Sequence, residues 1–75
     1  MKLEVNIENM NNADSFTVLY KAPEMVSWVS AATVYNFPHY ITGLDAGVTY
    51  QVKVVKNTKK GISTSVGGIS TRWVN

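Results

Sequence analysis

Apolar and polar side chains alternate along much of this chain, and this period of two predicts β-strands. In residues 2–8, the apolar residues Leu3, Val5 and Ile7 share one side, while polar residues occupy the other. This is the pattern of a strand with one buried face and one face in water. Residues 15–21 are rich in aromatic and β-branched side chains, and such residues favour a second strand.

The alternation places three further strands in the second half of the chain. Residues 48–56 form the clearest of them, with apolar side chains at every second position. A short strand is expected over residues 39–42. The last strand is expected over residues 62–75, interrupted at Gly67 and Gly68, because glycines inside a strand mark a bulge or a break into two short pieces.

The segments between these strands predict turns, with one ambiguity. Residues 9–14 are rich in Asn and Asp, which tolerate turn conformations. Residues 57–61 are expected to form a hairpin loop, in which Gly61 supplies the positive φ that the exit needs. Residues 25–36 would place apolar side chains on one face of either a helix or a strand. Their Val, Trp, Thr and Tyr content favours a strand, bent near residues 30–32.

Residues 43–54 carry the most specific pattern in the chain. Gly47 permits a tight turn, Leu44 is expected to point inward, and Tyr50 opens the alternating strand. In a β-sandwich corner of this kind, the Tyr ring packs in the core while its hydroxyl bonds to the backbone a few residues upstream. We therefore expect Leu44, Gly47 and Tyr50 to form a structural corner between two sheets.

Three stretches of the chain resemble the fibronectin type III family of immunoglobulin-like β-sandwiches. They are residues 15–23 (SFTVLYKAP), 40–54 (YITGLDAGVTYQVKV) and 57–65 (NTKKGISTS). The resemblance implies an all-β fold and a single domain over residues 1–75. It also implies a role outside catalysis, because the family mostly serves in adhesion, spacing and binding, and also decorates bacteriophage particles.

The chain departs from that family between Pro23 and His39. Only fifteen residues lie between them, where the family normally fits two strands or more. We therefore expect a single strand there and a trimmed sandwich of about six antiparallel strands. A missing strand leaves an open sheet edge, whose unpaired backbone groups invite another chain.

Composition indicates a small domain that depends on a partner. A chain of 75 residues buries a thin core, and with no Cys and one His it lacks the residues for disulfides or a zinc site. No apolar run is long enough to span a membrane, and the N-terminal residues do not form a secretory signal. If Met1 is the natural start, we expect a complete small protein made in a cytoplasm, with no cofactor and no metal.

Catalysis finds no support in the sequence. Ser, His and Asp occur, but no nucleophile motif is present. His39 follows Pro38 and is interpreted as a residue at the start of a strand. Glu4 and Glu8 are expected to face outward from the first strand as solvated surface groups. We therefore expect that the protein is not an enzyme.

A group of lysines offers three interpretations. Lys53, Lys56, Lys59 and Lys60 fall on one strand and the loop that follows it. They are expected to be solvated groups that protect a strand edge, although Lys56, Lys59 and Lys60 could also contact an acidic partner. Nucleic acid is disfavoured, because the net charge is only +2 and no aromatic residues for base stacking are interleaved with the lysines.

Aromatic residues are the stronger signal of interaction. The chain has two Trp, four Tyr and two Phe, more than so small a core requires. We expect Trp28, Tyr35, Phe37 and Trp73 to be candidate contacts with a protein partner, because large aromatics dominate interface energetics. The alternative for Trp73 is that it folds back over the end of the sandwich.

Together these observations favour a structural accessory protein that docks onto a larger assembly. The most plausible setting is a phage virion, where it would decorate or cement capsid or tail subunits through strand-edge pairing and an aromatic patch. The alternative is a recognition or adhesion module from a larger, extracellular bacterial surface protein or carbohydrate-active enzyme. In that case exposed aromatics would stack on sugar rings.

Overall fold

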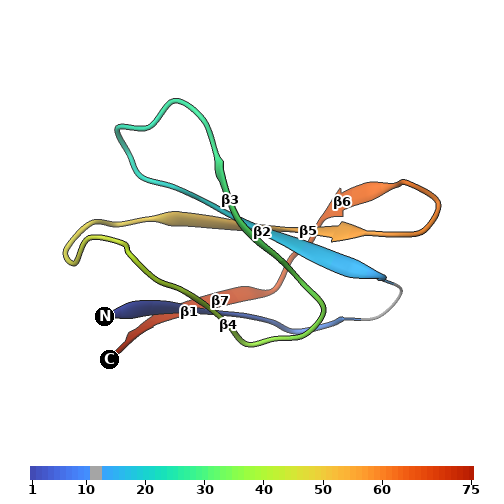
Figure 1. The fold of residues 1–75 in the computed structure, drawn as a ribbon, viewed down its shortest axis with the longest axis horizontal. Coiled ribbons are helices and arrows are strands. Elements are labelled where there is room, and N and C mark those ends of the chain that lie inside the picture. The colour runs from blue at the N-terminus through green and yellow to red at the C-terminus, as the bar shows by residue number, and fades with distance from the viewer. Residues whose placement is uncertain (11–12) are drawn as a thin grey trace.

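The computed structural model describes residues 1–10 and 13–75, and over these residues the chain forms seven β-strands and no helix (Figure 1). No helix that could cross a membrane is therefore present in the described part of the chain. The strands are β1 (Lys2–Ile7), β2 (Ser15–Lys21), β3 (Val29–Val34), β4 (His39–Ile41), β5 (Gln51–Asn57), β6 (Ser63–Ser65) and β7 (Ile69–Val74).

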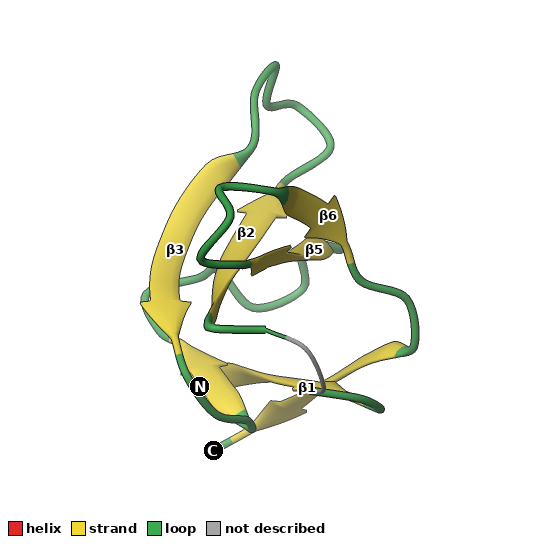
Figure 2. Cartoon of the chain, turned by 90° about the vertical axis from the view of Figure 1, so that its right-hand side faces the viewer, coloured by secondary structure: helices red, strands yellow, loops and turns green. Residues whose placement is uncertain are grey.

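The strands form two antiparallel sheets that face each other. One sheet has the order β4-β1-β7 and the other the order β3-β2-β5-β6, and the two layers are separated in Figure 2. This arrangement confirms the predicted all-β, sandwich-like fold. The turn predicted over residues 9–14 includes residues 11 and 12, which lie outside the described residues.

The core lies between the sheets and follows from the alternation in the sequence. Every second residue of β1 is buried, and Val18 of β2 lies directly opposite Val54 of β5. Because β1, β2 and β5 are interior strands of their sheets, neighbouring strands flank their inward side chains on both sides. The buried apolar residues are Leu3, Val5, Ile7, Phe16, Val18, Ala22, Ile41 and Val54.

The expected number of six strands is wrong, because the last predicted strand divides between the two sheets. β6 pairs with β5, whereas β7 crosses to the other sheet and pairs with β1. On the first side of the crossing, the N–H of Val66 donates to the Val54 carbonyl (2.9 Å). On the second side, the N–H of Glu8 donates to the Gly68 carbonyl (3.2 Å). Gly68 has a φ of 69°, a left-handed conformation that favours glycine and allows the chain to change direction.

The ambiguous segment 25–36 contains a strand, as predicted, and not a helix. β3 covers only Val29–Val34, and the residues before it form turns and bends. Its pairing with β2 shifts register, because Val18 lies opposite Ala32 while Leu19 lies opposite Ser30. Ala31 is therefore the extra residue of a β-bulge, which accounts for the bend expected at this point. β5 also begins later than predicted, at Gln51 instead of residue 48.

The structural corner forms as the sequence predicts. The N–H of Asp45 donates to the Tyr50 hydroxyl oxygen at 2.9 Å, Gly47 has a φ of 84°, and Leu44 packs against the core. The Tyr50 ring meets Tyr20 of β2 edge to face, with centroids 5.9 Å apart, and Trp73 of β7, with centroids 6.2 Å apart. Tyr50 therefore connects the two sheets at this end of the sandwich.

We expect Tyr50→Phe to lower the free energy of unfolding by about 1 kcal/mol, the typical net contribution of one hydrogen bond. The ring contacts with Tyr20 and Trp73 remain in this variant, so the loss isolates the hydroxyl. The measurement is urea denaturation followed by circular dichroism. Tyr35→Phe is the matched control, because the Tyr35 side chain is 71% exposed. Equal stability of the two variants would contradict the proposed role of the corner.

Candidate protein-interaction surface

The structure separates the four aromatic residues that the sequence singles out. Phe37 packs against Phe16 with ring centroids 5.3 Å apart. Trp73 lies on the inner face of β7, opposite Leu3, and packs against the core. Trp73 therefore folds back over the end of the sandwich. Trp28 and Tyr35 remain exposed, and they lie just before and just after β3, so the four residues do not form one patch.

The loop between β2 and β3 is the most prominent apolar feature of the surface. Residues 22–28 project away from the two sheets (Figures 1 and 2). A compact turn anchors the loop: the N–H of Ala22 donates to the Met25 sulfur at 3.3 Å, and the N–H of Met25 donates to the Ala22 carbonyl at 3.1 Å. Ala22 is itself buried, so the base of the loop is fixed in the core.

This loop presents two large apolar side chains. Val26 is 97% exposed and Trp28 is 36% exposed. The ammonium group of Lys53 lies 4.7 Å from the centroid of the Trp28 ring, a cation–π contact that holds the ring against the outer face of β5. The exposure of Val26 was not predicted, because residues 25–36 were expected to form a strand. The sequence signal for a loop here was Pro23, which lies just after β2, where the pairing of that strand ends.

The predicted lysine group divides into two places. Lys53 contacts Trp28 at one end of the sandwich. Lys56, Lys59 and Lys60 gather at the opposite end, where they line an open hollow with Asp14 and Ile62. The backbone N–H of Lys59 also donates to the Asp14 carboxylate. Lys53 and Lys56 also point to opposite faces of β5, because they stand an odd number of residues apart.

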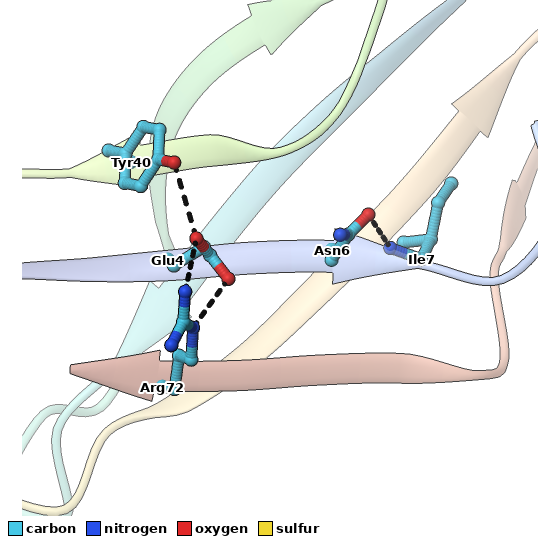
Figure 3. Close-up of polar contacts among 5 residues, drawn as sticks. All are labelled: Glu4, Asn6, Ile7, Tyr40 and Arg72. Atoms are coloured by element: carbon cyan, nitrogen blue, oxygen red, sulfur yellow. Dashed lines mark hydrogen bonds and ion pairs between the residues drawn. The ribbon is translucent and has the colours of Figure 1, made fainter. Parts of the chain in front are cut away.

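Glu4 is not the simple solvated group that the sequence suggests. Its carboxylate lies 2.9 Å from Nε of Arg72 on β7 and accepts a hydrogen bond from the Tyr40 hydroxyl of β4 at 3.2 Å (Figure 3). The Lys2 ammonium group lies 4.9 Å from the centroid of the Tyr40 ring. These contacts join all three strands of this sheet on its outer face. The hydrogen bond from Arg72 holds the pKa of Glu4 below its ordinary value of 4.5.

His39 is the one histidine of the chain. It lies at the start of β4, directly opposite Val5 of β1. Within residues 1–10 and 13–75, no group of three or more His, Cys, Asp or Glu side chains could hold a metal ion. The surface features that stand out are therefore the apolar β2–β3 loop, the lysine end and the sheet edges.

The lowered pKa of Glu4 predicts a pH-dependent contribution to stability. A carboxyl whose pKa is lower in the folded state stabilises the protein above its unfolded pKa, and this contribution is lost as the pH falls through the folded pKa. We therefore expect the stability difference between wild type and Glu4→Gln to be largest near neutral pH and to shrink below pH 4.5. Urea denaturation across this range measures it. Arg72→Gln should give the same trend, and a difference independent of pH would contradict the assignment.

Comparison with known proteins finds no match: no family model, no curated protein and no solved structure is similar to this chain.

Proposed function

We propose that this protein is a non-catalytic structural module that docks onto a larger protein assembly through its β2–β3 loop. The observation that carries the proposal is the nearly complete exposure of Val26 at an anchored loop, beside the exposed edge of Trp28. An isolated exposed apolar side chain is ordinary. A nearly fully exposed valine on an anchored loop, two residues before a partly exposed tryptophan, is a more specific feature, typical of a contact that a partner covers.

The energetics of the loop suit docking. Burial of the Val26 side chain would contribute roughly 1.5–2 kcal/mol, and tryptophan is among the residues that contribute most at interfaces. The two hydrogen bonds between Ala22 and Met25 already order the turn, which reduces the entropy lost on binding. Lys53 beside Trp28 favours a partner whose apolar pocket has an acidic rim.

The setting that fits best is a phage virion, with capsid or tail subunits as the partner. The support is the resemblance of residues 40–54 to fibronectin type III domains, some of which decorate phage particles, together with the small size of the core. Fold alone does not select a function. The alternative, a recognition module for carbohydrate, is favoured by the partly exposed ring of Trp28, which suits stacking on a sugar.

The test compares two aspartate variants, Val26→Asp and Ile62→Asp, at opposite ends of the molecule. We expect Val26→Asp to weaken binding to purified phage capsids or tails by roughly tenfold or more. Ile62→Asp is the matched control, because Ile62 is 59% exposed and lies in the β5–β6 loop at the lysine end. Co-sedimentation of the labelled protein with the particles measures both.

Four outcomes are informative. Loss of binding in Val26→Asp alone supports docking through the β2–β3 loop. Equal binding of both variants contradicts it, and preferential loss in Ile62→Asp moves the contact to the lysine end. Binding of the wild-type protein to polysaccharide but to no particle, abolished by Trp28→Ala, would replace the proposal with the carbohydrate alternative.

A further inference from the structure

The outer edge of β7 is an unpaired edge of the described sheets. β7 pairs with β1 on one side, and no described strand pairs with its other side. It spans six residues, contains no proline, and carries one charged side chain, Arg72. Long and regular edges of this kind readily pair with another strand unless they are protected.

The other three edges of the described sheets carry recognised forms of protection. β3 is interrupted by the bulge at Ala31, which twists an edge away from potential partners. β4 and β6 are each three residues long, and short edge strands offer few hydrogen bonds. β4 also begins directly after Pro38. The open edge is therefore specific to β7.

We propose that the β7 edge pairs with β7 of a second copy of this chain, in an antiparallel register centred on Thr71. The resulting two-fold dimer has a continuous six-stranded sheet, β4-β1-β7 followed by the same strands of the second copy in reverse order. The inference does not depend on the proposed function. It rests on the self-complementarity of β7, which only certain registers satisfy.

The choice of register follows from the two faces of the strand. Both sandwiches lie on the same side of a continuous sheet only if each inward residue of one copy lies opposite an inward residue of the other. The two-fold axis must therefore pass between two copies of the same residue. The longest registers of this kind are centred on Thr71, which overlaps residues 69–73, or on Arg72, which overlaps residues 70–74. The second places Arg72 directly opposite Arg72, and like charges directly opposite destabilise a pair.

In the register centred on Thr71, no cross-strand pair places like charges opposite each other. On the outer face, Arg72 lies opposite the uncharged Ser70 of the second copy and keeps its contact with Glu4. On the inner face, Thr71 meets Thr71, and Trp73 meets Ile69. Threonine pairs and pairs of an aromatic with a β-branched side chain are both favourable across strands.

A hollow in the monomer lies where the second copy would arrive. It opens beside β7 and is lined by Leu3, Tyr50, Thr71, Arg72 and Trp73 together with residues 47–49. In the dimer, Ile69 of the second copy lies opposite Trp73 at the mouth of this hollow. Pairing would therefore cover apolar surface in addition to satisfying backbone groups.

A cysteine at the two-fold axis tests the proposal directly. The chain contains no Cys, so Thr71→Cys introduces one thiol that faces its own copy at a spacing suited to a disulfide. We expect this variant to form a disulfide-linked dimer under mild oxidation. The matched control is Thr64→Cys, an exposed threonine on the edge strand β6, which should remain mainly monomeric. Equal crosslinking of the two variants, or none at Thr71→Cys, would overturn the proposal.

Opposite charges at the same position test the register without a covalent bond. We expect Thr71→Lys and Thr71→Glu each to weaken dimerisation roughly fivefold or more, and an equimolar mixture of the two to restore it as a heterodimer. Sedimentation from micromolar to millimolar protein measures the dimer, and circular dichroism checks the fold. Thr71 is exposed in the monomer, so either charge stays in water there. Wild-type protein that is monomeric throughout, or single variants that dimerise as strongly as wild type, would show that the edge does not pair in this way.

Discussion

The pairing of β1 with β7 is the contact on which the rest of the molecule depends. It runs from Lys2 opposite Val74 to Ile7 opposite Ile69, and joins segments from opposite ends of the described chain. β1 supplies buried residues at every second position, but the three-residue β4 covers only part of its other side. Without β7, the inward face of β1 would lose Trp73 and Ile69 as neighbours. Such pairing is non-local, so its loop-closure entropy must be paid before the contacts form.

The individual strands were predictable because alternation is a local property of the sequence. Residues 2–8 and 15–21 yielded β1 and β2, and the corner around Tyr50 was predicted down to the hydrogen bond that its hydroxyl accepts. Sheet membership was not predictable, because the alternation of residues 62–75 is compatible with pairing to either sheet. Gly67 and Gly68 indicated a break in this strand, but nothing in the sequence indicated that β7 would cross to pair with β1.

The surface was harder to predict than the core, and the reason is geometric. The contact between Glu4 and Arg72 joins residues that are 68 positions apart, and no local pattern relates them. Lys53 and Lys56 are close in sequence but point to opposite faces of β5. Among the four aromatics, exposure depended on where each backbone segment came to lie, so Phe37 joined the core while Trp28 stayed outside it. The docking role of Trp28 and Tyr35 stays a prediction.

The placement of the two tryptophans has a practical consequence. Trp73 sits in the aromatic contacts that join the sheets, whereas Trp28 sits on the projecting loop under Lys53. Their indole rings therefore occupy different solvent environments within one small chain. Replacing either one with phenylalanine leaves a single tryptophan, whose emission reports separately on the integrity of the sandwich or on events at the loop, without any attached dye.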